Sequence, residues 1–286
     1  PRPPAPPRVA FLDVGQGDAT LVQGARGAVL IDAGGVLPGG FDLGRDAVVP
    51  ALAALGVARV DLLVATHADL DHRGGIPAVL ERVPVGALWL PPGGVGDAAF
   101  APVVAAARAR GVPVFERGAG SAPERFGDVR VRPLWPPAGR RADSRNDRSL
   151  VVQAEVGGAR VLLPGDLEAS GEAALLASGA ALRSEVLKLG HHGSRGATSP
   201  AFLEAVGAEL AIASAACAGR FEMPHPQVLA RARARRMAVW WTGRDGAVLV
   251  GLGATRSARG TGERRSHCGV GGAASDARRL GYAPAP

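Results

Sequence analysis

Short apolar runs bounded by glycine, proline or aspartate recur along the chain to about residue 252, and such runs predict β-strands. Strands are predicted at the start of Val9–Asp18 and at Thr20–Gln23, Ala28–Asp32, Asp61–Thr66, Ala87–Leu90, Ser149–Val152, Arg160–Pro164, Glu185–Gly190 and Glu209–Ser214. Helices are predicted at Arg45–Leu55, Gly75–Arg82, Pro200–Val206 and Val228–Met237. Because strands and helices alternate, the pattern indicates an α/β fold.

One arrangement of strand, histidine-containing loop, helix and strand occurs twice. The strand Asp61–Thr66 leads into the loop HADLDH, and the strand Glu185–Gly190 leads into HHGSRGATS. A buried strand that delivers polar residues at its carboxyl end is the usual way an α/β protein builds a site. We therefore expect two sheets or half-domains to meet at one site.

Composition excludes several classes of protein. A hydrophobic content of 47% in 286 residues excludes a wholly disordered chain. The two cysteines, Cys217 and Cys268, are too few for a framework of several disulfides or for a four-cysteine zinc site. The longest apolar stretch, Ala47–Thr66, is interrupted by Arg59 and Asp61, so no membrane span is predicted.

The net charge of +7 is uneven along the chain. From residue 253 onward six arginines face Glu263 and Asp276, so this segment carries +4 of the +7 and leaves the rest only mildly basic. Charge alone therefore does not identify the partner. We expect a Pro-rich linker at 1–8 that tethers a soluble domain to a membrane protein, a folded domain at 9–252, and a disordered basic tail at 253–286.

The loop HADLDH holds four potential metal ligands: His67, Asp69, Asp71 and His72. Imidazole and carboxylate groups at this density suit a divalent metal, and we expect two metals. The alternative is a solvated acidic turn or a helix N-cap. Two carboxylates and two imidazoles directly after an apolar strand disfavour that alternative.

Two further carboxylates fit the same site. Asp32 ends the strand AVLID, and Asp166 follows the strand RVLLP in the turn PGDLE. Taken alone, each is an ordinary turn aspartate. Along the chain, a strand that ends in Asp is followed by HxDxDH, then by a strand that leads into Gly-Asp, and then by a strand that leads into His. This order favours a shared site.

Several segments in this order resemble a known family over roughly residues 9–252. They are LDVGQGDAT, LIDAGG, THADLDH, GARVLLPGD and LKLGHHGS, with PHP at 224–226 and TGRDGAV at 242–248. The chain resembles the metallo-β-lactamase fold superfamily and, within it, the soluble nuclease-like domain of the ComEC family of competence DNA-uptake channel proteins. The resemblance implies an αββα sandwich, in which two mixed β-sheets are flanked by helices, with a dinuclear metal site at one edge.

Carried over by position, the resemblance implies a set of metal ligands. They are His67, Asp69, Asp71, His72, a bridging Asp166 and His191, which is favoured over His192 because it follows the strand directly. Asp32 is expected to orient a ligand or loop from the second layer of residues. The remaining positions of uncertain role are Asp18, Asn146, Ser149, His192 and Ser194.

The sequence departs from the usual pattern of these hydrolases in two ways. Asp69 replaces the second histidine of HxHxDH, and no histidine occurs between His72 and His191. Asn146 or Ser149, just before a strand, occupies the region of the missing histidine and can offer only a neutral oxygen. Hard oxygen ligands favour Mn²⁺ as the cofactor, with Mg²⁺ or Zn²⁺ as alternatives.

The resemblance implies a metal-dependent DNase that degrades one DNA strand during uptake through a metal-activated hydroxide. Catalytic roles are expected for Asp71, for His225 as a proton donor and for Lys188 as a phosphate contact. Two alternatives remain open for these residues: His225 is a turn or capping residue, and Lys188 lies on the solvent face.

Two alternative functions also remain open. One is another hydrolase of this fold (a thioesterase, lactonase or phosphorylcholine esterase), and the other is a non-catalytic DNA-guiding channel module. DNA and the channel portion of a parent protein are the expected partners, at the extracytoplasmic face of the cytoplasmic membrane.

Overall fold

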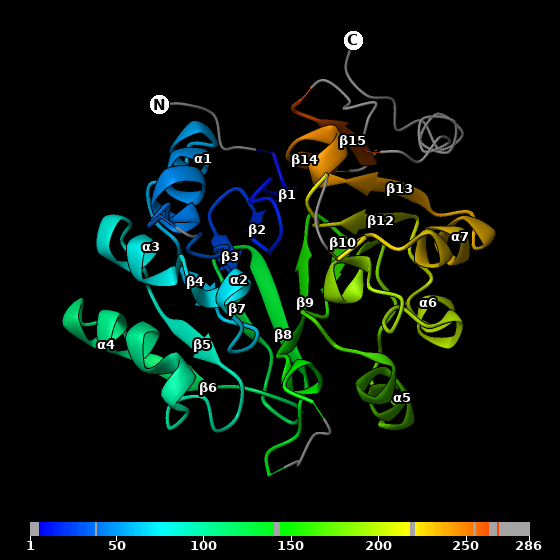
Figure 1. Ribbon diagram of the computed structural model, residues 1–286. Coiled ribbons are helices and arrows are strands. Elements are labelled where there is room, and N and C mark those ends of the chain that lie inside the picture. The colour runs from blue at the N-terminus through cyan, green and yellow to red at the C-terminus, as the bar shows by residue number, and fades with distance from the viewer. Residues whose placement is uncertain are drawn as a thin grey trace.

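Two mixed β-sheets pack face to face, and helices cover the outer face of each (Figure 1). The computed structural model describes residues 6–37, 39–139, 144–217, 221–253, 256–262 and 268. The first sheet has the strand order β15-β14-β1-β2-β3-β4-β5-β6, and the second has β13-β12-β11-β10-β9-β8-β7. This αββα sandwich confirms the predicted fold class.

The bounds of the elements are as follows. The first sheet contains β1 (Arg8–Phe11), β2 (Thr20–Gln23), β3 (Ala28–Ile31), β4 (Leu62–Val64), β5 (Leu88–Leu90), β6 (Val114–Glu116), β14 (Val248–Leu252) and β15 (Arg256–Gly260). The second contains β7 (Glu124–Phe126), β8 (Val129–Trp135), β9 (Val151–Val156), β10 (Ala159–Leu163), β11 (Val186–Lys188), β12 (Leu210–Ala213) and β13 (Ala238–Trp241). The α-helices are α1 (Val49–Ala54), α2 (Leu70–Arg73), α3 (Ile76–Arg82), α4 (Ala101–Ala109), α5 (Ala169–Ala177), α6 (Pro200–Val206), α7 (Pro226–Ala234) and α8 (Thr242–Asp245). Short helical turns are η1 (Gly44–Val48, a π-helix), η2 (Ala98–Phe100), η3 (Asn146–Arg148) and η4 (Gly190–Gly193).

Alternation along the strands divides the core into three layers. In β1, Val9 and Phe11 face the second sheet, whereas Ala10 packs with the helices on the outer face. Successive strand residues point to opposite faces, so a strand that is buried on both faces reads as a continuous apolar run. Figure 1 shows α1, α3 and α4 outside the first sheet and α5, α6 and α7 outside the second.

Parallel strands bring the two histidine loops to one edge of the sandwich. Strands β3 to β6 run parallel to one another, and so do β10 to β13. The predicted pair of strand, loop, helix and strand units falls one in each sheet, with β4 leading into the first loop and β11 into the second. The expectation that two sheets meet at one site is confirmed.

The described domain extends beyond both of the boundaries expected from sequence. β1 begins at Arg8, inside the expected linker. β15 pairs antiparallel with β14, from Val248 opposite Gly260 to Leu252 opposite Arg256, so part of the expected tail is strand. No helix in the described part of the chain has the length and apolar character that crossing a membrane requires.

A disulfide joins Cys217, in the loop after β12, to Cys268, 51 residues later. We expect Cys217→Ser to lower the free energy of unfolding by about 2 to 4 kcal/mol, because the cross-link restricts the unfolded chain. Urea unfolding of the oxidised wild type and of the variant measures the difference. Equal unfolding midpoints would show that the cross-link contributes nothing to stability.

Candidate metal centre

The chemical groups of the site come from loops at the carboxyl ends of strands in both sheets. Asp18 precedes β2, Asp32 follows β3, His67 and His72 follow β4, Asp166 follows β10, and His191 and His192 follow β11. Asp18 reaches the site because Gly17, at φ +140°, lets its loop lie directly against the backbone of Asp71. The Asp18 N–H donates to the Asp71 carbonyl at 3.1 Å.

Four buried side chains converge there: Asp18, His72, Asp166 and His192. One ligand atom from each lies within 4.8 Å of the other three. His72 Nε2 is 3.2 Å from Asp166 Oδ1, and His192 Nε2 is 3.3 Å from Asp166 Oδ2. Asp71, more exposed, places Oδ2 3.2 Å from His192 Nε2. The two Asp166 oxygens therefore lie between His72 and His192.

The hydrogen bonds of two histidines leave ligand atoms facing each other. His72 Nδ1 donates to Asp32 Oδ2 at 2.8 Å, and His192 Nδ1 donates to the Ser214 carbonyl at 2.8 Å. In the neutral rings the Nε2 atoms then carry lone pairs, and they lie 3.3 Å apart. Two lone pairs at this separation repel each other unless a cation or a proton lies between them. The two Nε2 atoms, together with the Asp166 oxygens, therefore form a set of ligand atoms that fits a divalent metal.

His67 presents a ligand atom in the same way. The Thr66 hydroxyl donates its proton to Asp32 Oδ2 at 2.7 Å, so it accepts the bond from His67 Nδ1 at 2.9 Å. His67 Nε2 is buried without a hydrogen-bond partner among the described residues. It lies 3.8 Å from both Asp69 Oδ2 and Asp166 Oδ2. His67 Nε2 therefore faces two carboxylates at the edge of the four-residue cluster.

Burial and neighbouring charge shift the pKa values of the site in opposite directions. Burial and the charge of His72 lower the pKa of His67 to about 4. Burial opposes protonation of His192, but the charges of Asp166 and Asp18 outweigh it and raise the pKa of His192 to about 9. Although burial also disfavours the charged form of Asp166, the charges of His192 and His72 hold its pKa well below its usual range.

We expect the metal-free chain to lose stability as the pH rises from about 6.5 to about 9. The raised pKa of His192 means that the folded chain binds a proton that the unfolded chain releases above about pH 6.5. This stabilisation is complete below pH 6.5 and disappears as the pH passes 9. Urea midpoints measured across this range with a chelator test it, and a midpoint that rises with pH would contradict it.

Asp32 is placed to orient His72 and the loop that carries it. It accepts from the Thr66 N–H at 2.8 Å as well as from the Thr66 hydroxyl and His72. In Asp32→Asn the amide NH₂ can face His72 Nδ1 and force the proton onto Nε2, the ligand atom. We expect metal affinity to fall about 10- to 100-fold, measured by calorimetry. An unchanged affinity would show that Asp32 does not set the His72 tautomer.

The structure favours His192 over His191 as the ligand, which revises the preference from sequence. His192 is 1% exposed within the cluster, whereas His191 lies at its edge, with Nδ1 3.0 Å from Glu168 Oε1. His191 Nε2 remains 3.7 Å from Asp166 Oδ2. Both histidines have left-handed backbone angles, φ 45° and 54°, which non-glycine residues rarely adopt. That sharp reversal of the chain directs the second imidazole, and not the first, into the centre.

Three other positions of uncertain role lie around the site. The Ser149 hydroxyl accepts from the Asp166 N–H at 3.1 Å and so positions the Asp166 loop. The Asn146 amide lies 3.4 Å from His191 Nδ1. Ser194 is half-buried, and its hydroxyl accepts from Gly196 N at 3.4 Å within its own loop.

Lys188 is not an exposed phosphate contact, and it does not point to solvent. Its side chain is 2% exposed, and its ammonium contacts the Asp18 carboxylate and lies 3.0 Å from the Gly165 carbonyl and 3.4 Å from Asp166 Oδ1. Burial opposes the charged form, but Asp18 and Asp166 raise the pKa of Lys188 above its ordinary value. Lys188 therefore acts as a fixed positive charge beneath the cluster.

His225 is the N-cap of α7. Its Nδ1 accepts from the Gln227 N–H at 3.2 Å, which is the capping role left open by the sequence. Its backbone N–H donates to the Gly193 carbonyl at 2.9 Å, so the PHP turn lies against the HHGS loop. Because Nδ1 accepts, the neutral ring carries its proton on Nε2.

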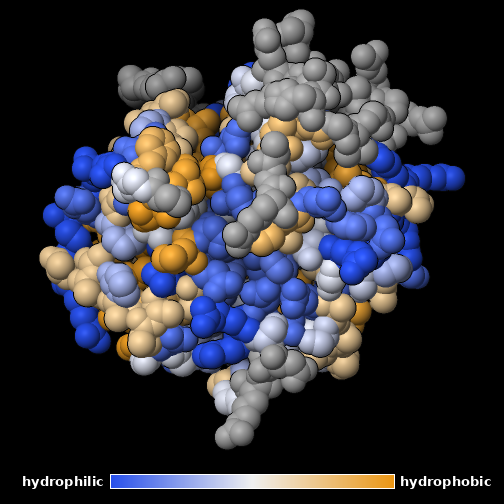
Figure 2. Space-filling model, viewed as in Figure 1, coloured by the Kyte–Doolittle hydropathy of each residue, from blue (hydrophilic) through white to orange (hydrophobic). Residues whose placement is uncertain are grey.

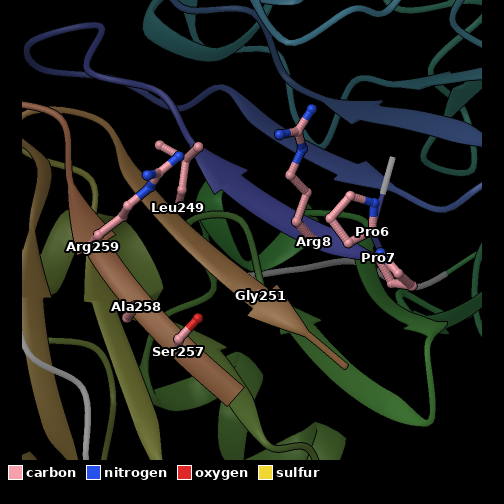
Figure 3. A pocket seen from close by; sticks show the side chains of 8 residues that line it. All are labelled: Pro6, Pro7, Arg8, Leu249, Gly251, Ser257, Ala258 and Arg259. Atoms are coloured by element: carbon pink, nitrogen blue, oxygen red, sulfur yellow. The ribbon is translucent and has the colours of Figure 1, made fainter. Parts of the chain in front are cut away.

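Two cavities differ in their relation to this site. A void of about 10 Å³, about the size of one water, lies beneath it and is lined in part by Asp18, Asp32 and Lys188. A larger pocket of about 340 Å³ lies on β1, β14 and β15, and Figure 3 shows its lining residues, from Pro6 to Arg259. No candidate ligand lines this larger pocket, so it is separate from the metal centre.

Comparison with known proteins identifies the family. A model of the metallo-beta-lactamase superfamily matches residues 12–216, which contain all the candidate ligands. The chain belongs to the metallo-beta-lactamase superfamily. This metallo-beta-lactamase domain is 35% identical over 252 residues to the ComE operon protein 3 of Bacillus subtilis, with 84% of this chain and 32% of the relative covered. It is also 35% identical over 260 residues to the competence protein ComA of Neisseria gonorrhoeae, with 88% and 34% covered.

The domain spans about a third of the length of these two relatives. Among solved structures, CmlA, a diiron β-hydroxylase from Streptomyces venezuelae, shares the fold with a TM-score of 0.52 at 14% identity. The alignment covers 82% of this chain and 51% of CmlA. Metallo-beta-lactamase folds bind divalent metals and are generally metal-dependent hydrolases, and the described part of this chain holds a four-residue candidate metal site around Asp166.

Proposed function

We propose that this domain is a metal-dependent phosphodiesterase that cleaves DNA and degrades one strand during DNA uptake. The observation that carries the proposal is the arrangement of His67, His72 and His192, whose ligand atoms all face Asp166 because their Nδ1 atoms are held by oxygen acceptors. The similarity to ComE operon protein 3 and to competence protein ComA supports DNA as the substrate.

Two metal positions follow from the donor atoms. Asp71, His72, Asp166 and His192 would hold one divalent ion, with Asp18 beside them, and His67, Asp69 and Asp166 would hold the second. The number of carboxylates supports Mn²⁺ or Mg²⁺ over Zn²⁺. A divalent ion bound there supplies a Lewis acid for a phosphate oxygen and lowers the pKa of bound water.

The chain's own residues then position the reaction. Asp32, Thr66 and the Ser214 carbonyl hold the imidazoles in the tautomer that binds metal. Lys188 offsets part of the carboxylate charge without contacting solvent. His225, with its proton on Nε2 and its turn against the HHGS loop, is the candidate donor to the leaving oxygen.

The disulfide supports a location outside the cytoplasm. Disulfides form and persist in oxidising compartments and are rare in the cytosol. The bond between Cys217 and Cys268 therefore supports a domain on the extracytoplasmic face of the cytoplasmic membrane. The similarity to competence proteins about three times as long supports a parent protein with a channel portion beside this domain.

Cleavage of end-labelled DNA tests the proposal. The purified chain is incubated with single- and double-stranded DNA together with Mn²⁺, Mg²⁺, Zn²⁺ or a chelator. We expect cleavage with Mn²⁺ or Mg²⁺ and none with the chelator. If the chain binds metal but cleaves DNA under none of these conditions, the proposal is contradicted and a non-catalytic DNA-guiding module is favoured.

A further inference from the structure

An exposed leucine separates two of the candidate ligands. Leu70 lies between Asp69 and Asp71 at the start of α2, and it is 59% exposed. The core does not cover this side chain, so it is accessible to a molecule that binds over the candidate ligands on either side of it.

A short hairpin, whose stem at Gly35 lies against the Leu70 backbone, carries three more exposed apolar side chains. Val36 is 44% exposed, Leu37 45% and Phe41 51%. The Leu37 N–H donates to the Phe41 carbonyl at 2.8 Å, and Val36 forms a bridge with the residue after Phe41.

The stem of this hairpin is packed against the loop of the site. A Cβ atom added to Gly35 would lie 3.1 Å from the Leu70 carbonyl oxygen and 3.2 Å from Asp71 Cα. We call Val36, Leu37, Phe41 and Leu70 the apolar rim. Figure 2 shows hydrophobic residues gathered beside a hydrophilic band that runs down the middle of this face.

Arginines supply positive charge at the same site. Arg145, 65% exposed, places Nη1 3.2 Å from Asp69 Oδ1. Arg73 follows on α2, and its Nε–H donates to the Ala68 carbonyl at 2.7 Å. Arg195, in the loop after His192, is also exposed. Apolar and cationic groups thus border the same candidate ligands.

This combination fits single-stranded DNA. An unpaired strand presents flat apolar bases together with phosphates, and proteins bind it through stacking side chains and a positively charged groove. A duplex keeps its bases stacked inside and offers no such face to the rim. A protein or membrane partner seated on Leu70 would instead cover Asp69 and Asp71, the residues that the substrate must reach.

We propose that the apolar rim, with Phe41 as its aromatic member, stacks the bases of single-stranded DNA and makes the site selective for an unpaired strand. The inference rests on the proposed function and names its substrate class.

Binding under a chelator tests the rim without any cleavage. Fluorescence anisotropy of a labelled oligothymidylate and of a labelled duplex is measured with the wild type, Phe41→Ala, Leu70→Ala and the matched control Phe115→Ala. Phe115, on edge strand β6, is 40% exposed and lies outside the rim. We expect Phe41→Ala and Leu70→Ala to weaken single-strand binding at least about 5-fold relative to Phe115→Ala, with duplex affinity unchanged.

The outcomes separate this inference from the proposed function. Rim variants that bind single strands as tightly as the control, in a chain that cleaves DNA, would overturn the rim alone. A wild type that neither binds nor cleaves DNA would overturn both. Loss of vesicle binding or of dimerisation in Phe41→Ala, with DNA binding intact, would assign the rim to another partner and also overturn the inference.

Discussion

Asp166→Asn is expected to remove metal binding and to lower the DNA cleavage rate about 1,000-fold or more. Asp166 offers one oxygen 3.2 Å from His72 Nε2 and another 3.3 Å from His192 Nε2, and it is the residue shared by both proposed metal positions. The amide of asparagine presents an NH₂ group to one of these lone pairs, so one metal–oxygen contact is lost. A metal contributes several kcal/mol to the transition state, and about 1.4 kcal/mol corresponds to tenfold in rate.

The substitution leaves the loop intact, because the backbone N–H of residue 166 still donates to the Ser149 hydroxyl. Circular dichroism and the urea midpoint in the presence of a chelator check that the fold survives. Asp46→Asn, on η1, serves as the matched control and should keep wild-type rates, because its carboxylate contacts Arg45 and the Asp42 N–H and none of the candidate ligands. Near-normal cleavage by Asp166→Asn would remove the centre of the proposed site.

Alanine substitutions of the two adjacent histidines are expected to have very different effects on metal content and cleavage rate. His192→Ala should lose one metal per chain and nearly all activity, because the His192 imidazole lies inside the cluster with its Nδ1 held by the Ser214 carbonyl. His191→Ala removes a half-buried ring that contacts Glu168, so metal content should stay at the wild-type value. Metal per chain by elemental analysis and the cleavage rate are compared for the two variants.

The opposite pattern, with metal lost in His191→Ala and kept in His192→Ala, would restore the preference suggested by the sequence. Equal loss in both variants would show that both imidazoles hold metal, because the two substitutions remove the same group from neighbouring positions.

Much of the fold was readable from local patterns. Strands buried on both faces appear as apolar runs, and β2, α6 and β12 lie where those runs and Pro200 placed them. The Asp and His residues that follow such runs marked the site, because parallel strands end together at one edge of a sheet.

The remaining features depend on contacts between distant segments. Asp18 joins the cluster only because Gly17 lets its loop approach Asp71. The direction of Lys188 depends on where Asp18 lies, since the strand alone permits either face. The pairing of Cys217 with Cys268 and the strand β15 connect the end of the described chain to the body, and no local pattern signals either.

Titration of the metal-free chain with Mn²⁺ in a calorimeter tests the central claim most directly. The convergence of three imidazole nitrogens on Asp166 predicts saturable binding of up to two ions per chain, lost in Asp166→Asn and reduced in His192→Ala. A folded chain that binds no divalent ion, or that binds equally well without Asp166, would contradict the account.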